Sequence, residues 1–552
     1  MDAERALRLA EMMREDFQSR KATLDLCRHY GYQMRVDGSP AYQNDRNDRL
    51  SPLTTSVPAS LAWRLAMYLH ANTLGVGNVF FGLDVETKDP KKRVSKADRN
   101  AVRDQTFKVI RRLFDTNFSS ETNIAFNDLA VIGNNVTECR YDEATNKFVF
   151  RSYSVGNGVY FGDDSLGRCD MFCRFFKYDA KQALQEFGKQ AGARVEEALN
   201  GKTASTTTQF EYVWLVYPRE VFREEVASGR WKKSPSSKKR FGSVIVDVQE
   251  RRVVKEDGYD DFPFAATTWQ KRGGTAYGYG PIEMSIADIK DLLEYKHLKR
   301  KAVRKTVNPP IVVSSLWEGI STDENAVTFV EGEVGNMMAP LPIPTNLPQL
   351  AEDINECVKN IRLNLMLDAF EALNETTKYM TTSEVNGRIG QSVRAIAPIV
   401  SRIHNQYFSP LIRRVFNIMV DRGEITLPAG VEAGDVTVKY VSVLDSMILQ
   451  GESSKMQEFV GFVMNLIQAR AGLGDEFDCY LDMEAILNHV ADYYNVPTDV
   501  VRDSKQIMEL LEDLSSRRDA ARQQELQAAM VKPLDMQKRS QQGSPMSGYV
   551  RG

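Results

Sequence analysis

Several groups of residues in the sequence could carry chemistry, but each lacks the partners that a catalytic or metal site needs. The glycine-rich stretch 273–280 lacks the lysine that completes a phosphate-binding loop, so it does not predict nucleotide hydrolysis. The five histidines are scattered, with no His-Glu-x-x-His pair, and no Gly-x-Ser-x-Gly elbow holds a nucleophilic serine. Cys169 and Cys173 have no partners at zinc-finger spacing, which indicates core thiols. The sequence therefore predicts a protein that is not an enzyme, with no cofactor and no metal site.

Positive charge is concentrated in the second half of a predicted helix at residues 281–306, whose first half carries an apolar stripe. Lys296, Arg300 and Arg304 are four residues apart and so share one helix face. Lysine and arginine contact the phosphate backbone of DNA without reading its sequence. The alternatives are an ordinary solvated helix face or salt bridges to acids of neighbouring subunits. The candidates for DNA contact in this helix are Lys296, Lys299, Arg300, Lys301 and Arg304.

The composition is that of an ordinary globular protein rather than of a globally basic one. The 552 residues include 71 Lys and Arg against 74 Asp and Glu, a net charge of −3, and 42% of them are hydrophobic. At about 150 residues per domain, this length suggests about three to four domains. Any surface that attracts nucleic acid must therefore be local.

The sequence also bears on the compartment. No run of about 20 apolar residues predicts a membrane helix, so we expect no membrane insertion. The first residues, Met-Asp-Ala-Glu-Arg, lack the basic and then apolar layout of a signal peptide. Six cysteines in a chain of this length do not form a disulfide framework, so we expect assembly in a reducing cytoplasm.

The periodicity of apolar residues predicts an α+β fold that is predominantly helical. Helices are expected at 3–32, 57–74, 95–118 and 119–132, the last with a capping-type start at Ser119. From residue 134 the pattern changes to that of strands, and 136–141 and 147–151 should form a hairpin. Further strands are expected at 158–161, 171–176, 210–217, 243–254 and 264–269, with a helix at 179–199.

The second half of the chain is again mostly helical. Asn308-Pro309-Pro310 ends the basic helix, and a strand-and-turn insert with a proline-rich run follows it. A polar break at 374–378 separates a helix at 351–373 from a helix at 382–422, which Pro398 or Pro410 should kink. A strand is expected at 435–443, and then helices at 446–468, 483–494 and 504–530. The tail, 531–552, is rich in Gln, Ser, Gly and Lys and should be disordered.

Four segments carry a resemblance to a known family. They are Trp269 to Pro281 (Trp…Gly-x-x-Tyr-Gly-x-Gly-Pro), Ile286 to Leu292, Lys305 to Pro310, and Met380 to Val385 with Arg388. In these segments the chain resembles the portal, or head-to-tail connecting, proteins of short-tailed bacteriophages. Thr382 stands where the family usually has a small alanine. The likeness runs in consistent order over about residues 5 to 520.

The resemblance implies the portal fold and a ring, usually of twelve subunits, at one vertex of the capsid in the virion, with duplex DNA passing along its axis. It implies an α+β wing, a two-helix stem, a small α/β clip, a long tunnel helix and a helical crown. The corresponding ranges are 1–280 (wing), 281–307 and 351–373 (stem), 308–350 (clip), 374–443 (tunnel loop, kinked helix and return strand of the wing), 444–530 (crown) and 531–552 (tail).

The resemblance also implies roles for single residues. Lys378 falls in the tunnel loop, where it would face DNA. Arg388, Arg394 and Arg402 lie on the following helix, which can turn only some of them toward the channel, and the others would pair with acids. In the clip, an acidic surface would meet a protein partner or keep an exposed loop soluble. The acids of this surface are Asp323, Glu324, Glu331 and Glu333.

The implied partners are further copies of the chain, double-stranded DNA bound without sequence preference, the large terminase subunit, a tail adaptor, and the major capsid and scaffolding proteins. Internal core proteins are possible partners as well. Two other readings remain open at this point. One is a nucleic-acid-processing enzyme, and the other is a different virion structural protein, such as a tail adaptor or an internal ejection protein.

Overall fold

The computed structural model divides the chain into two compact units, Met1–Ser453 and Ser454–Gly552. The residues that it describes all belong to the first unit; they are 1–33, 55–74, 79–86, 96–200, 208–222, 239–271, 273–307, 311–313, 338–340, 346–374, 382–428 and 431–440. The predicted helices between 446 and 530 and the predicted disordered tail lie outside the described residues.

The N-terminal part of the chain is helical, as predicted. Its four helices are α1 (Ala3–Gly31), α2 (Val57–Thr73), α3 (Lys96–Phe114) and α4 (Phe118–Val131). The expected capping start at Ser119 is wrong, because α4 begins one residue earlier and Asn117 precedes it without a capping hydrogen bond. Asn117 instead bonds both the N–H and the C=O of Phe150, at 3.0 and 2.8 Å. These bonds satisfy the outer edge of a strand, which would otherwise be open to pairing.

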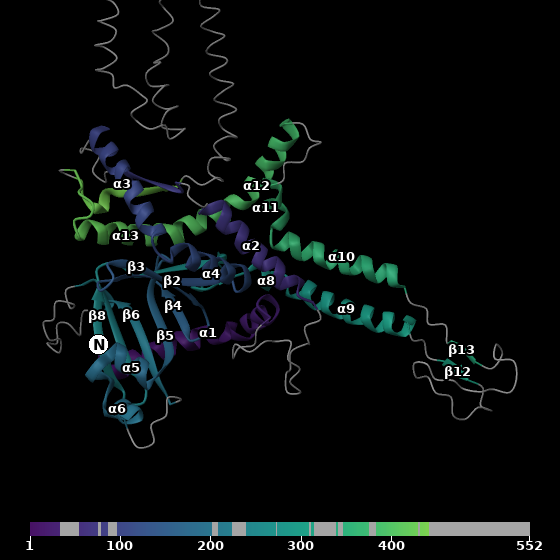
Figure 1. Cartoon of the computed structure of the whole chain (residues 1–552), viewed down its shortest axis with the longest axis horizontal. Coiled ribbons are helices and arrows are strands. Elements are labelled where there is room, and N and C mark those ends of the chain that lie inside the picture. The colour runs from purple at the N-terminus through teal and green to yellow at the C-terminus, as the bar shows by residue number, and fades with distance from the viewer. Residues whose placement is uncertain are drawn as a thin grey trace, which may run out of the picture. The chain divides into compact units, whose positions relative to one another are not determined.

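Two antiparallel sheets follow the helices (Figure 1). The smaller has the order β3-β2-β9, with β2 (Asn134–Asp142), β3 (Lys147–Ser154) and β9 (Phe264–Thr268). The larger has the order β4-β5-β6-β7-β8, with β4 (Val159–Asp163), β5 (Cys169–Asp179), β6 (Gln209–Pro218), β7 (Phe241–Asp247) and β8 (Arg252–Tyr259). All pairs in both sheets are antiparallel, which confirms the predicted α+β character.

Three predicted elements of this region differ from the structure. The strand expected at 243–254 is two strands, because the chain turns after Asp247 and Arg251 adopts φ 50°. The helix expected at 179–199 is broken at two glycines into α5 (Ala180–Phe187), the 3₁₀ turn η1 (Gly188–Ala191) and α6 (Ala193–Asn200). The short strand β1 (Phe81–Val85) is not predicted at all, and it pairs with β14 (Val436–Tyr440).

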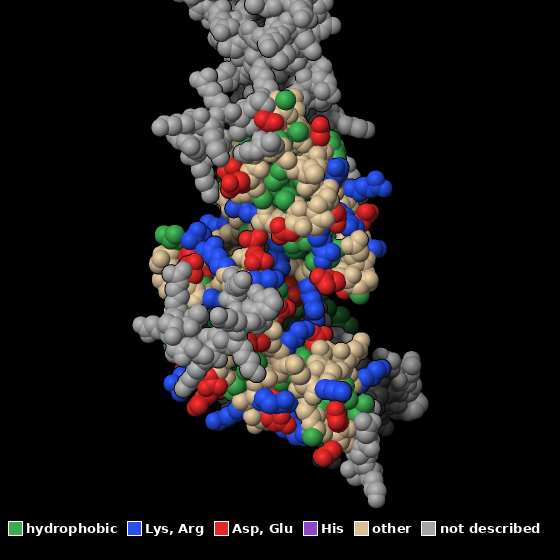
Figure 2. Space-filling view, turned by 90° about the vertical axis from the view of Figure 1, so that its left-hand side faces the viewer, with side chains coloured by type: hydrophobic (Ala, Val, Ile, Leu, Met, Phe, Trp, Pro, Cys, Tyr) green, Lys and Arg blue, Asp and Glu red, His purple; other side chains and the backbone are tan. Residues whose placement is uncertain are grey.

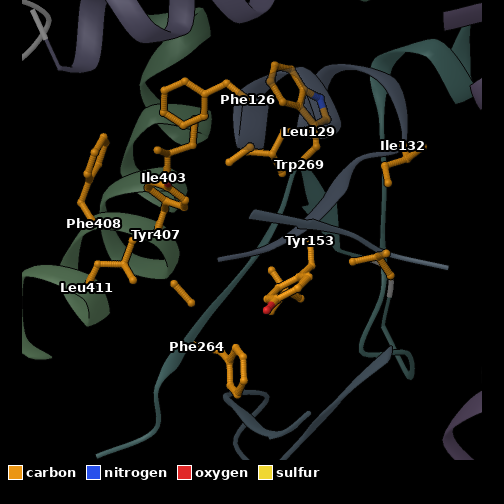
Figure 3. Packing of buried hydrophobic residues seen from close by; sticks show 14 of the residues in the cluster. Phe126, Leu129, Ile132, Tyr153, Phe264, Trp269, Ile403, Tyr407, Phe408 and Leu411 are labelled. Carbon is orange, nitrogen blue, oxygen red and sulfur yellow. The ribbon is translucent and has the colours of Figure 1, made fainter. Parts of the chain in front are cut away.

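The main core lies where the smaller sheet meets the helices. Phe126 of α4 lies 5.7 Å from the ring of Tyr407 and 6.2 Å from that of Phe408 (centroid to centroid; Figure 3). On the other side of this sheet, Phe264 stacks on Phe172 of the larger sheet at 3.8 Å. Five aromatic residues of β3 and β4 are buried as well: Phe148, Phe150, Tyr153, Tyr160 and Phe161.

The helices that follow the sheets are more broken than predicted. The helix expected at 281–306 is α8 (Pro281–Met284) and α9 (Ile286–Val307), interrupted at Ser285, whose hydroxyl donates to the Pro281 carbonyl at 2.9 Å. The helix expected at 351–373 is α10 (Leu347–Asn364) and α11 (Leu367–Asn374), with Met366 at φ 52° between them. Both breaks are local deviations of the backbone that apolar periodicity does not reveal.

The predicted long, kinked helix is confirmed. It consists of α12 (Thr382–Ile403), a π-helical turn η5 (His404–Phe408) and α13 (Ser409–Asp421). Pro398 lies inside α12, and the π turn comes directly before Pro410. Prolines and π turns are the usual causes of sharp helix bends.

The remaining short elements complete the described part of the chain. They are the 3₁₀ turns η2 (Arg219–Phe222) and η6 (Ala433–Asp435) and the two-stranded pairs β10 (Gln270–Lys271) with β11 (Gly278–Tyr279) and β12 (Ile311–Val313) with β13 (Met338–Pro340).

Candidate nucleic-acid interface

The basic residues proposed to meet DNA lie mainly on α9, which pairs with α10 as an antiparallel helix hairpin (Figure 1). The first half of α9 is buried through Ile289, Leu292 and Leu293, and α10 is buried through Ile354, Cys357 and Ile361. Asn360 of α10 donates to Asp288 of α9 at 3.2 Å and fixes the alignment of the two helices. The apolar half of α9 thus anchors a basic half that is mostly exposed.

The structure divides the basic residues of α9 between two faces. Lys301 and Lys305 line a cavity of about 290 Å³ between α9 and α10, together with Leu298 and Leu350. Arg304 is exposed and does not line this cavity; it lies about 100° around the helix from its neighbour Lys305, which does. Arg300, four residues before Arg304, lies on the same exposed face.

The first residue of the predicted face is held differently. Lys296 is half-buried, and its Nζ donates to Oγ1 of Thr55 at 3.1 Å. It therefore ties α9 to the residues before α2 rather than standing free on the helix. Lys299 is half-buried as well. Of the five candidates on α9, Arg300, Lys301 and Arg304 are the exposed ones.

Four basic residues in the outer half of α9 have no acidic partner among the described residues. Lys299, Lys301, Arg304 and Lys305 form no ion pair with any described residue. Two basic residues in the last turn also interact favourably with the negative end of the helix dipole. The arrangement can therefore attract an external anion along one helix.

The arginine candidates on α12 also differ in exposure. Arg394 is exposed, whereas Arg402 is half-buried and donates to the main-chain carbonyl of Trp269. Arg402 thus holds the loop after β9. Arg388 lies within α12, but its side chain is outside the described residues, as are Lys378 and the acidic residues of the predicted clip (Asp323, Glu324, Glu331 and Glu333).

The glycine-rich segment before α8 has a structural task. Gly133 has φ +70°, and a Cβ there would lie 2.2 Å from the backbone nitrogen of Gly280. The Asn134 side chain accepts from the N–H of Gly278 at 2.7 Å and donates to its C=O at 2.9 Å. Tyr277 is buried, with its ring 4.9 Å from that of Phe17. The two segments 132–134 and 277–280 therefore interlock and set where α8 begins.

The glycine motif, the two ends of α9 and the start of α12 lie in the segments that carry the sequence resemblance. The sequence matches the family of bacteriophage head to tail connecting proteins over residues 3–501. The chain belongs to this family. Among its relatives, the "Probable portal protein" of Bordetella phage BPP-1 is 25% identical over 366 residues, which cover 65% of this chain and 64% of the relative. The "Portal protein" of Salmonella phage epsilon15 is 25% identical over 381 residues, 67% of this chain and 66% of the relative. The chain thus spans just under two thirds of the length of these two relatives.

Sequence reasoning missed one residue that shapes the site, Asn134, and it missed the partner of Arg402. Asn134 links the end of α4 to the glycine motif, and Arg402 links α12 to Trp269. The partner of Asn134 is 144 residues away, and pairing at that distance has no local signal. No described helix is long and apolar enough to cross a bilayer. No group of His, Cys, Asp or Glu among the described residues is arranged to hold a metal ion.

Proposed function

We propose that the chain is a subunit of a portal ring, which occupies one vertex of a phage capsid, in the virion, and conducts duplex DNA during packaging and ejection. The family match over residues 3–501 is the observation that carries this proposal. The names of the two relatives support it. Contacts between unlike surfaces that close on rotation generate rings, and an elongated helix hairpin with exposed apolar residues suits such contacts. Val303, Val307 and Leu363 are exposed apolar residues of this hairpin.

The proposed ring has a wing (1–280), a stem (281–307 and 351–373), a clip (308–350), a tunnel segment with the return strand of the wing (374–443) and a crown (444–530). Two observations support this division. The hairpin of α9 and α10 has the form of a two-helix stem, and the short pair β12–β13 lies between these helices in the sequence. The pairing of β14 with β1 returns the chain after the long helix to its N-terminal part.

The exposed face of α9 that holds Arg300 and Arg304 is the proposed DNA-facing surface of the stem. A channel for DNA of any sequence should contact phosphate rather than base edges, and it should hold DNA weakly enough to let it move. A few basic residues per subunit, repeated around a ring, give such a lining on a protein of net charge −3. In the tunnel segment, Lys378, Arg388 and Arg394 are the further proposed contacts.

The proposed partners follow from this role. The clip, with its four acids, would meet the large terminase subunit during packaging and a tail adaptor afterwards. The wing would meet the major capsid and scaffolding proteins, and internal core proteins would approach the crown. Assembly would take place in the cytoplasm of the host.

Native mass spectrometry of the purified chain tests the proposal. A ring predicts one dominant species whose mass is a fixed multiple of 62.4 kDa. A monomer at all concentrations would favour the second candidate, another virion structural protein such as a tail adaptor or internal ejection protein. Hydrolysis of nucleoside triphosphates or magnesium-dependent cleavage of DNA by the purified chain would instead favour an enzyme.

A further inference from the structure

A cluster of three arginines surrounds one buried tyrosine–glutamate pair where the two sheets meet. Glu138 and Tyr153 are each 6% exposed, and the Tyr153 hydroxyl donates to Oε2 of Glu138 at 2.8 Å. Arg151 of β3 lies directly opposite Glu138 in the register of the smaller sheet. Arg174 reaches the same pair from β5 of the larger sheet. We call Arg140, Arg151 and Arg174 the arginine site.

Two of the three guanidinium groups of this site lie against aromatic rings. Those of Arg151 and Arg174 lie 5.3 and 4.9 Å from the centroid of the Tyr153 ring. Arg174 also lies 4.8 Å from the centroid of the Phe176 ring. Contact with aromatic rings orients a guanidinium while leaving its N–H groups available for carboxylate or phosphate. None of the three arginines forms an ion pair with another described residue.

The electrostatics of the site leave a local excess of positive charge. Glu138 is the acid at its centre, and burial raises the pKa of Glu138 although all three arginines act to lower it. The carboxylate of Asp142 also acts on Arg140, so the three guanidinium groups exceed the two nearby carboxyls by one positive charge. Such an arrangement, oriented before any ligand arrives, binds an anion at a reduced cost in conformational entropy.

The surroundings indicate which kind of anion fits. Figure 2 shows the face of the molecule on the side of β8 and α13, where Lys and Arg side chains are interspersed with Asp and Glu. Beside the site, Lys177 lies three residues after Arg174 on β5 and pairs with Glu211 of β6 at 2.6 Å. Duplex DNA carries about one charge per 1.7 Å of its axis and needs a continuous basic surface. A cluster of only three arginines is too small for duplex DNA and suits a short acidic segment of a protein instead.

We propose that the arginine site of the wing docks a short acidic segment, rich in Asp or Glu, of a partner protein. Planar guanidinium groups form paired, charge-assisted hydrogen bonds with carboxylates, which gives both strength and geometric selection. This inference goes beyond the proposed ring and channel, because it concerns a surface that neither DNA passage nor closure of the ring requires.

The test uses the purified full chain and a fluorescein-labelled hexaglutamate peptide, with binding followed by fluorescence anisotropy at low salt. The double variant Arg140→Gln/Arg151→Gln should weaken peptide binding by about tenfold or more, because it removes two charge-assisted contacts. The triple variant with Arg174→Gln added should weaken it further. Because Arg174 also packs between two rings, the double variant, whose residues are exposed, keeps the test independent of folding.

The matched control is Arg168→Gln/Arg252→Gln, which removes the same charge from two exposed arginines that already pair with Asp164 and Glu250. It should bind the peptide as the unmodified chain does. Equal weakening in the control and in the double variant would overturn the proposal. The proposal would also be overturned if the double variant bound a short random-sequence DNA duplex more weakly than the unmodified chain does.

The oligomeric state of the double variant completes the test. If the variant folds but no longer assembles, as judged by circular dichroism and native mass spectrometry, a second copy of the chain covers the site and the proposal is wrong. If it assembles normally and fails only to bind the peptide, the proposal holds. Failure of the unmodified chain to form a ring would refute the proposed function and would leave the peptide result interpretable by itself.

Discussion

At the scale of single residues, buried polar side chains form a hydrogen-bonded network where α1, α4 and β2 meet. Asp128 is 5% exposed, accepts from the Tyr32 hydroxyl, and accepts from Nδ2 of Asn135 at 2.9 Å. Asn135 also donates to the Ser152 hydroxyl at 2.7 Å, so the network reaches β3. A network of this kind specifies one arrangement of its elements when every member is satisfied.

The network makes a prediction about pH. Burial raises the pKa of Asp128 from 3.8 to about 6. Between these two values the folded chain binds a proton that the unfolded chain has released, so the free energy of unfolding falls as the pH rises. The decline is complete above the folded pKa and amounts to about 3 kcal/mol. Asp128→Asn should lack this part of the decline.

Thermal unfolding midpoints of both proteins between pH 4 and pH 7 measure the effect. The difference between the unmodified chain and Asp128→Asn should change in favour of the variant as the pH rises. Parallel pH profiles for the two proteins would show that the Asp128 carboxyl does not titrate in this range.

The interlocked glycines make a second prediction at this scale. Gly133→Ala should destabilise the fold by about 2–4 kcal/mol, because the residue has φ +70° and its Cβ would collide with the backbone of Gly280. Gly273→Ala is the control, since a Cβ there meets no atom within 4 Å. Denaturant unfolding of both variants gives the comparison, and similar stabilities would contradict the assigned role of the contact.

At the scale of elements, the two faces of α9 are expected to differ in how strongly they bind DNA. Arg300→Gln/Arg304→Gln removes two charges from the exposed face, and Lys301→Gln/Lys305→Gln removes two from the face beside α10. We expect the first pair to weaken duplex binding and to flatten its dependence on salt concentration, by about 0.9 in the logarithmic slope for each phosphate that the ring no longer neutralises. The second pair should change both quantities less.

Salt titrations of DNA binding by the purified assemblies distinguish the two α9 variants. Native mass spectrometry of each variant shows whether the ring forms. If the Lys301/Lys305 pair affects DNA binding more, the exposed face of α9 is not the face that meets DNA.

The elements also show how far the sequence predicts this fold. The helices α1 and α2, the β2–β3 hairpin and the kinked α12–α13 helix follow from local periodicity and turn residues, and they are predicted nearly to their ends. The strand β1 is missed because its five residues gain their partner, β14, some 350 residues later. Such pairing depends on tertiary contacts rather than on the strand's own pattern.

Other misses had a local signal that periodicity obscured. The turn between β7 and β8 contains neither glycine nor proline, but the Asp247 carboxylate accepts from the N–H groups of Gln249 and Glu250 at 2.9 and 3.0 Å. Aspartate at this position is a turn signal in itself.

Only part of the candidate site could likewise be predicted from the sequence. The basic half of α9 is visible in the sequence, whereas the burial of Lys296 depends on Thr55, and the arginine site depends on β5 meeting β3.

At the scale of the whole molecule, the proposed DNA channel depends on the assembly of many copies. A single chain of net charge −3 has little attraction for DNA, and the proposed channel exists only when many copies place the same helix face around one axis. The free cysteines among the described residues (Cys27, Cys139, Cys169, Cys173 and Cys357) do not offer a covalent link between copies, because burial raises the pKa of each thiol and keeps it unreactive. We therefore expect no link between copies through these five thiols.

Electron microscopy of the purified chain tests this central claim most directly. End-on views should show a closed ring of identical subunits with an axial opening at least as wide as duplex DNA. A preparation that contains only compact single particles, or rings without an opening, would contradict the account.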